Sequence, residues 1–182
     1  MFGVEKLDNK LANLVREGTV SVVYPEKHSA RVIFENKERL ISAELPVLTT
    51  FASKNKAYNL PDVGERVVCI MASNNSSGGG YIIGSLYNTE HTPPADCYQD
   101  VTKIEFADEA FISYDRAAHN FRIQFSDDSF INFDGEHGEL EIYCKGFIII
   151  EGEKRLEITT KDEILIDSKA DVEVTGRNIR LN

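Results

Sequence analysis

The sequence predicts an all-β protein in two parts, a small closed barrel followed by a repetitive β-rod. Three observations in the 182 residues support this prediction. The first half alternates short apolar segments with turn residues, a proline-containing stretch follows, and the second half repeats pairs of apolar residues. A hydrophobic content of 42% is enough for one ordinary domain or two small ones, so a disordered chain is not expected.

A short helix is expected at the start of the chain. Val4, Leu7, Leu11 and Leu14 recur at steps of three and four residues with charged residues between them, which places them in one narrow apolar stripe. Gly18 then ends the helix. The stripe offers an apolar face either to a docking partner or to the chain's own barrel, and the pattern favours neither.

Five strands are expected next, over residues 19–24, 30–35, 40–45, 65–71 and 81–86. Short polar turns separate the first three strands, whereas a long loop precedes the fourth. A meander of three strands followed by a long connection is typical of the OB-fold, a small five-stranded barrel. A fragment of a β-sandwich is the alternative.

A linker is expected after the barrel, because Pro93 and Pro94 can neither continue a strand ladder nor bend freely. The sequence therefore divides into an N-terminal helix (1–17), an OB-fold barrel (18–87), a linker (88–98) and a β-helix (99–182).

Beyond the linker, apolar residues recur in pairs of the form apolar-x-apolar. Two residues at positions i and i+2 lie on one face of a strand, so each pair predicts one very short strand with a polar outer face and a turn. Five pairs follow at steps of eight residues: Leu140/Ile142, Ile148/Ile150, Leu156/Ile158, Ile164/Ile166 and Val172/Val174. The other pairs are Ile104/Phe106, Ile112/Tyr114, Ile123/Phe125, Ile131/Phe133 and Ile179/Leu181.

A single chain of such strands would bury only two side chains per unit and would expose its strand edges. Three chains wound about one axis solve both problems, because each strand pairs with neighbouring chains and the apolar pairs fill a central prism. We therefore expect an intertwined, triple-stranded β-helix built from octad repeats, with a monomeric β-solenoid or an ordinary meander as alternatives. The residues expected in the trimer core are Ile104, Phe106, Ile112, Ile123, Phe125, Ile131, Phe133, Leu140, Ile142, Ile148, Ile150, Leu156, Ile158, Ile164, Ile166, Val172 and Val174.

Charge limits the classes of partner. The chain carries 30 acidic and 20 basic residues, a formal net charge of −10, and such a chain repels phosphate groups and anionic membrane surfaces. Residues 1–98 hold 10 basic and 11 acidic side chains and so form no basic groove for nucleic acid. The charged residues among the first 16 interrupt any signal-peptide core, which predicts a cytoplasmic site of synthesis and argues against a cell-surface scaffold.

No catalytic, cofactor or metal site is expected. The densest acidic cluster could form an acid/base pair or a calcium site, but it lacks the regular spacing of a calcium loop, and solvating charge at turns is the favoured interpretation. Its members are Asp127, Asp128, Asp134, Glu136 and Glu139.

The cysteines and histidines also indicate no site. Cys69, Cys97 and Cys144 are odd in number and far apart, which predicts buried or incidental thiols. Each of the four histidines is isolated in the sequence, so a solvated or hydrogen-bonded side chain is expected for each. They are His28, His91, His119 and His137.

Four stretches of the barrel half carry a resemblance to a known family: residues 30–34 (ARVIF), 42–48 (SAELPVL), 60–68 (LPDVGERVV) and 80–88 (GYIIGSLYN). In this order, and with the octad array behind them, they resemble the baseplate assembly protein V family, the central tail spikes of contractile phages. Relatives occur in contractile bacteriocins and injection systems. In that family an OB-fold is followed by a proline-containing linker and a trimeric β-helix, which is the order found here.

The resemblance implies a structural protein and not an enzyme, because the short linker leaves no room for the lysozyme domain of some tail spikes. It implies a homotrimer that docks on a tail hub by its N-terminal half and helps to pierce the target cell envelope. Docking would involve Val4, Leu7, Leu11 and Leu14. The spike would be assembled in a bacterial cytoplasm and become part of a phage virion or bacteriocin baseplate.

The C-terminal end departs from family members that bind an iron ion, because no His-x-His stands in the final repeats. A separate conical tip protein is therefore expected there, on Arg177, Ile179, Arg180, Leu181 and Asn182. Pairing of Arg177 and Arg180 with the terminal carboxylates is the alternative. A different class of function, an OB-fold nucleic-acid-binding protein with an acidic β-rich oligomerisation domain, is the main rival.

Overall fold

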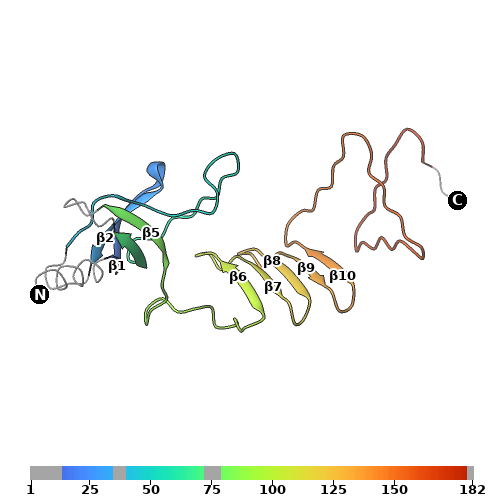
Figure 1. The fold of residues 1–182 in the computed structure, drawn as a ribbon. Helices are drawn as coiled ribbons and strands as arrows, with labels where there is room; N and C mark the ends of the chain where they lie inside the picture. The colour runs from blue at the N-terminus through green and yellow to red at the C-terminus, as the bar shows by residue number, and fades with distance from the viewer. Residues whose placement is uncertain (1–13, 35–39, 72–78, 180–182) are drawn as a thin grey trace, which may run out of the picture.

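The computed structural model of the chain describes residues 14–34, 40–71 and 79–179. Two sheets of five strands follow one another along the chain, and an extended segment follows the second sheet (Figure 1). The only helical element of the described residues is the 3-10 turn η1, Pro25–Lys27. The prediction of an all-β protein is therefore confirmed.

The first sheet contains β1 (Val15–Tyr24), β2 (Ser29–Phe34), β3 (Leu45–Pro46), β4 (Arg66–Met71) and β5 (Gly80–Ser85), in the order β3-β2-β1-β4-β5. Its two edges meet, because Val47 forms a parallel bridge with Ile82 and the N–H of Leu48 donates to the carbonyl of Ile82 at 2.8 Å. The sheet is thus a nearly closed barrel, as the sequence predicted.

Strand alternation sends one side of each strand into the barrel. The interior is apolar and consists of Val20, Ala30, Val32, Phe34, Leu45, Val67, Cys69, Met71 and Ile82. Strands β1 and β2 lie close together at Gly18, where a Cβ would lie 2.5 Å from the carbonyl oxygen of Ile33. Glycine at this position allows the close approach.

Strand β1 begins earlier than the sequence suggested. Residues 15–17, which we expected at the end of the N-terminal helix, pair antiparallel with β4, and Val15 lies opposite Ile70. Gly18 therefore lies within a strand and does not end a helix, because continuation of the ladder along β4 satisfies more backbone groups than a helix end. The rest of the predicted helix, including Val4, Leu7 and Leu11, lies outside the described residues.

The predicted third strand is also shorter than expected. Only Leu45–Pro46 is a strand, while Ile41 forms an isolated bridge with Ile33. The cause is Ser42, whose Oγ accepts a hydrogen bond from the N–H of Val32 at 2.9 Å. A side-chain oxygen thus takes the place of a ladder carbonyl.

The second sheet is an antiparallel meander of β6 (Val101–Glu105), β7 (Phe111–Asp115), β8 (Asn120–Gln124), β9 (Phe130–Asp134) and β10 (Glu139–Tyr143). Its order is β10-β9-β8-β7-β6, so each strand pairs with its neighbour in sequence. We expected these units to pair with neighbouring chains, and that expectation is wrong for β7, β8 and β9, which pair on both sides within one chain. The ordinary meander, our alternative, describes this part of the chain.

Tight turns explain the local pairing. The N–H of Glu109 donates to the carbonyl of Phe106 at 3.0 Å, and Asp128 makes the same contact with Phe125 at 3.1 Å. Glu109 and Asp128 both have positive φ, 68° and 67°. The same turn therefore recurs nineteen positions later, which makes the repeating unit of the meander a hairpin and not an octad.

The linker is folded, and its end is tied to the second sheet. Asn88 Oδ1 accepts hydrogen bonds from the N–H groups of Glu90 and His91. Asp96 pairs with Lys103 of β6 at 3.0 Å, and the Tyr98 hydroxyl donates to the carboxylate of Asp115. The N-terminal end of the meander is thus fixed by polar contacts.

Residues 144–179 contain no regular strand or helix. They run in extended loops beyond β10 (Figure 1). No helix of the described residues is long and apolar enough to span a membrane.

Candidate assembly surface

One face of the meander carries a continuous row of isoleucines. Cross-strand register places Ile104 opposite Ile112, Ile112 opposite Ile123, Ile123 opposite Ile131, and Ile131 opposite Ile142. All five belong to the predicted trimer core. We call this set the isoleucine row.

A second row lies beside it on the same face. Tyr114, Phe121, Phe133 and Leu140 stand opposite one another in sequence order, and all four are exposed. Phe106 and Phe125, also predicted core residues, follow β6 and β8 at the turns and are exposed too. The face is therefore a broad apolar surface in an isolated chain, and soluble proteins rarely leave such a surface uncovered.

On the opposite face of the meander, charged and aromatic side chains contact one another. Lys103 is only 7% exposed and pairs with Asp96 and Glu105 at 3.0 and 2.7 Å. Its Nζ lies 4.4 Å from the ring centre of Phe111, and the guanidinium of Arg122 lies 4.1 Å from that of Phe130. Only the isoleucine face lacks such partners among the described residues.

Lys103 and Asp96 affect each other's titration. Desolvation opposes the charged form of Lys103, but hydrogen bonds to Glu105 and Asp96 outweigh it and raise its pKa. The hydrogen bond from Lys103 lowers the pKa of Asp96. Both shifts favour the ion pair near neutral pH.

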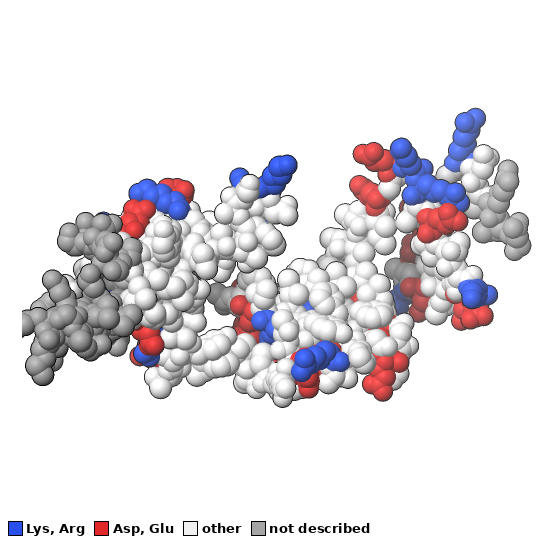
Figure 2. All heavy atoms as spheres, in the orientation of Figure 1, with Lys and Arg blue, Asp and Glu red and all other residues white. Residues whose placement is uncertain are grey.

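Exposed apolar side chains also occur along residues 144–179. Among the predicted core residues of this segment, Ile150 and Ile158 are each 66% exposed. The remaining predicted core residues of this segment are also exposed, namely Ile148, Leu156, Ile164, Ile166, Val172 and Val174. Figure 2 shows that charged side chains gather at the rims of this part of the molecule, with uncharged surface between them.

The total exposed area of the chain exceeds that of a compact monomer. The chain exposes 15679 Å² at a mass of 20.4 kDa. A compact monomer of that mass exposes roughly 8,800 Å² by the usual scaling of surface with mass. All of residues 145–179 are exposed and none lies in a strand or helix, so this segment contributes to the excess.

The acidic cluster stabilises turns. Asp127 Oδ1 accepts the N–H of Ser129 at 2.9 Å, and Asp127 Oδ2 accepts its hydroxyl at 2.9 Å. Asp134 accepts the N–H groups of Glu136 and His137. The hydrogen bonds from Ser129 lower the pKa of Asp127, and the His137 side chain lowers that of Asp134.

The cluster does not converge on one point as a metal or acid/base site would. Asp128 pairs with Lys145, while Glu136 and Glu139 are exposed. No group of three or more histidine, cysteine, aspartate or glutamate side chains in the described ranges could hold a metal ion.

The cysteines occupy three different environments. Cys69 is buried in the barrel, and burial raises the pKa of its thiol to about 11. Cys97 and Cys144 are half-buried, in the linker and directly after β10. All three are free thiols.

The predicted docking residues are only partly within the described chain. Leu14 is exposed, and its carbonyl accepts the N–H of Met71 at 2.8 Å. At the other end Ile179 and Arg177 are exposed, whereas Arg180, Leu181 and Asn182 lie outside the described residues. Among the described residues, no contact joins the docking residues of the N-terminal half to those near the C-terminal end.

Sequence reasoning missed some members of the apolar face. Phe121 stands opposite Tyr114 and Phe133 but was not among the expected core residues. The nineteen-residue period would have found it, because Phe121 is equivalent to Leu140 under that shift.

Scanned against models of known protein families and against curated protein sequences, the chain has no match.

Proposed function

We propose that the chain is the homotrimeric central spike of a contractile tail or bacteriocin baseplate. The barrel half docks on a tail hub, and residues from about 99 onward form a rigid rod that helps to breach the target cell envelope. The role is structural and not enzymatic, and it uses no cofactor or metal.

The uncovered apolar surface carries this proposal. The isoleucine row and, after it in the sequence, the apolar pairs of residues 144–179 are left largely uncovered in the isolated chain, and we call them together the apolar array. Three copies about one axis would cover the array with identical surfaces and close the rod.

The finer fold belongs to the same proposal. The barrel pairs β1 with β2 and β4, β4 with β5, and β5 with the continuation of β3 by a parallel bridge. This cyclic order supports the proposal that the barrel is an OB-fold. Residues 144–182 would form the intertwined, triple-stranded β-helix, since they have no regular strand of their own in the described part of an isolated chain.

The partners of the spike follow from the resemblance. The tail hub would bind the N-terminal half, with Val4, Leu7, Leu11 and Leu14 as contacts. A conical tip protein would cover the end at Arg177, Ile179, Arg180, Leu181 and Asn182. A trimer mixed with such a protein should give a three-to-one complex, and deletion of residues 176–182 should abolish it.

The rival function, binding of single-stranded nucleic acid by the barrel, has less support. Tyr58 and Tyr81 are exposed and could stack on bases. However, Lys27 pairs with Glu44 at 3.0 Å and Arg66 pairs with Glu17 at 2.6 Å, which neutralises two of the basic side chains of the barrel. A titration with single-stranded DNA at low salt should therefore show no binding.

The proposed function is tested by locating the chain in contractile particles. Antibody against the chain should label the baseplate end of particles in electron micrographs, and particles from cells that lack the chain should have neither label nor a central spike. Particles that assemble with a complete spike in the absence of the chain would refute the proposal.

A further inference from the structure

The outer edge of β10 is where pairing within the chain stops. On one side β10 pairs with β9 over its whole length, from Glu139 opposite Asp134 to Tyr143 opposite Phe130. None of the described residues pairs with its other side. All five residues of β10 are exposed, whereas Ile131 on β9 is half-buried. A free strand edge beside an apolar face is a template for pairing with another strand.

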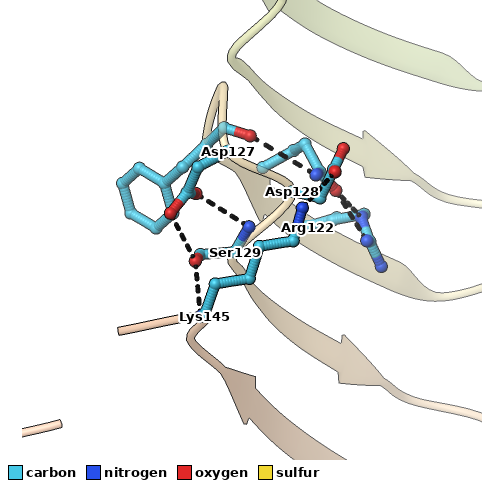
Figure 3. Close-up of polar contacts among 7 residues, drawn as sticks. Arg122, Asp127, Asp128, Ser129 and Lys145 are labelled. Atoms are coloured by element: carbon cyan, nitrogen blue, oxygen red, sulfur yellow. Dashed lines mark hydrogen bonds and ion pairs between the residues drawn. The ribbon is translucent and has the colours of Figure 1, made fainter. Parts of the chain in front are cut away.

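The contacts of Lys145 direct the chain away from that edge (Figure 3). Its N–H donates to Ser129 Oγ at 3.1 Å, and its Nζ lies 2.6 Å from Asp128 Oδ2. Ser129 is itself buried and is held by Asp127. These residues form the β8–β9 turn, on the β9 side of β10. A sixth hairpin strand on the outer edge of β10 would have to leave in the opposite direction, so it would break both contacts of Lys145.

The next segment of the chain nevertheless has the pattern of a strand that would fit the edge. Ile148 and Ile150 follow Leu140 and Ile142 by eight positions and have the same spacing. Phe147 to Ile150 are four consecutive exposed apolar residues. A groove of about 540 Å³ lies over the β8–β9 turn, the start of β9 and the end of β10, and its lining includes Phe125, Ile142 and Tyr143.

We infer that residues 147–150 of a second copy of this chain pair with the outer edge of β10, where one of Ile148 and Ile150 continues the isoleucine row and the other continues the second row beyond Leu140. This inference rests on the proposed homotrimer. It adds the point in the sequence at which strand pairing changes from pairing within one chain to pairing between chains. Up to β10 the strands pair within one chain, and from Phe147 onward they pair between chains. Continuity with the apolar face argues for a second copy as the occupant, because the same i, i+2 pattern continues from one segment into the next.

Disulfide trapping between two tagged chains tests the inference. Both chains carry Cys97→Ser and Cys144→Ser, which leaves only the buried Cys69. One chain carries Ile142→Cys, and the other, with a different tag, carries Ile148→Cys or Ile150→Cys. The matched control replaces these by Ile166→Cys, in an apolar pair two repeats further on. Mild oxidation of the mixed trimers is followed by denaturing electrophoresis without reductant.

A dimer band that contains both tags is expected with Ile148→Cys or Ile150→Cys and not with Ile166→Cys, and reductant should remove it. Mixed trimers that give no such band with either partner would overturn the inference and leave the proposed trimer intact. A monomeric wild-type chain in light scattering would overturn both. If the cysteine variants fail to assemble, hydrogen exchange of the unmodified chain decides, since amides of residues 147–150 should be protected only in the assembled state. Absence of that protection in the trimer would refute the inference.

Discussion

Replacement of Ile150 and Ile158 by aspartate distinguishes an assembled chain from an isolated one. Both side chains are 66% exposed in the isolated chain, so the double substitution should change the stability of a monomer by less than about 0.5 kcal/mol per site. In the trimer, burial of the exposed two thirds of an isoleucine contributes about 1–2 kcal/mol, and six such side chains contribute roughly 6–12 kcal/mol.

That contribution is comparable to the ~8 kcal/mol that corresponds to micromolar affinity. The aspartates add a further cost of several kcal/mol for each uncompensated buried charge. Ile150→Asp/Ile158→Asp should therefore be a monomer at micromolar concentration when its mass is measured by light scattering after size exclusion.

Leu165→Asp is the matched control. Leu165 is 81% exposed and lies between the members of the Ile164/Ile166 pair, so it belongs to the outer face of the predicted strand. This variant should remain a trimer. A trimeric Ile150→Asp/Ile158→Asp variant would show that these side chains do not face the axis, and the reasoning from the apolar pairs would be refuted.

Three further predictions concern the barrel, the turns and the N-terminal segment. Leu45 is fully buried, so Leu45→Ala should lower the free energy of unfolding of the barrel by about 2–5 kcal/mol in urea denaturation, without change in the trimer mass; an unchanged midpoint would contradict the packing described. The Asp134 carboxylate raises the pKa of His137 above 6.5, so the pair stabilises the folded state fully below that value and the stabilisation is lost as the pH rises through the folded-state pKa. His137→Gln should therefore lower the urea midpoint relative to wild type at about pH 5.5 and not at about pH 8.5, and an equal effect at both would exclude this ion pair as the cause. Deletion of residues 1–13, which stops before the β1–β4 ladder, should leave a soluble trimer that fails to enter particles, whereas normal incorporation would refute the docking role of that segment.

The barrel could be predicted because its strands follow local rules. Alternation of apolar and polar residues set β1, β2, β4 and β5 to within a few residues, and the turn before β4 contains Gly64 with φ of 95°. The third strand was overestimated because the Ser42 hydroxyl, and not a backbone group, accepts the N–H of Val32. Hydrogen bonds of this kind depend on the fold and leave no periodic signal.

In the second half the sequence predicted which residues share a face, but not which strands pair. The i, i+2 pairs are found on one side of the meander, as their spacing requires. Pairing within the chain depends on the hairpin turns, where Glu109 and Asp128 adopt positive φ. The similar stretches FADEAF and FSDDSF carry this information, and a search for nineteen-residue periodicity would have found it.

The polar contacts at the two ends of the meander could not be predicted from the sequence. Lys103 and Asp96 join the linker to β6, and Lys145 and Ser129 join the segment after β10 to the β8–β9 turn. Each contact requires that a loop returns to a strand end at hydrogen-bond distance. Charged residues of this kind are common in any acidic β-rich chain, so composition alone does not single them out.

The central claim is that the apolar array is covered by two further copies of the chain. Native mass spectrometry of the purified wild-type protein at micromolar concentration tests it most directly, because it counts subunits without a change to the sequence. We predict one dominant species at three times the chain mass of 20.4 kDa. A dominant species at 20.4 kDa, or at twice that mass, would contradict the trimer and the account built on it.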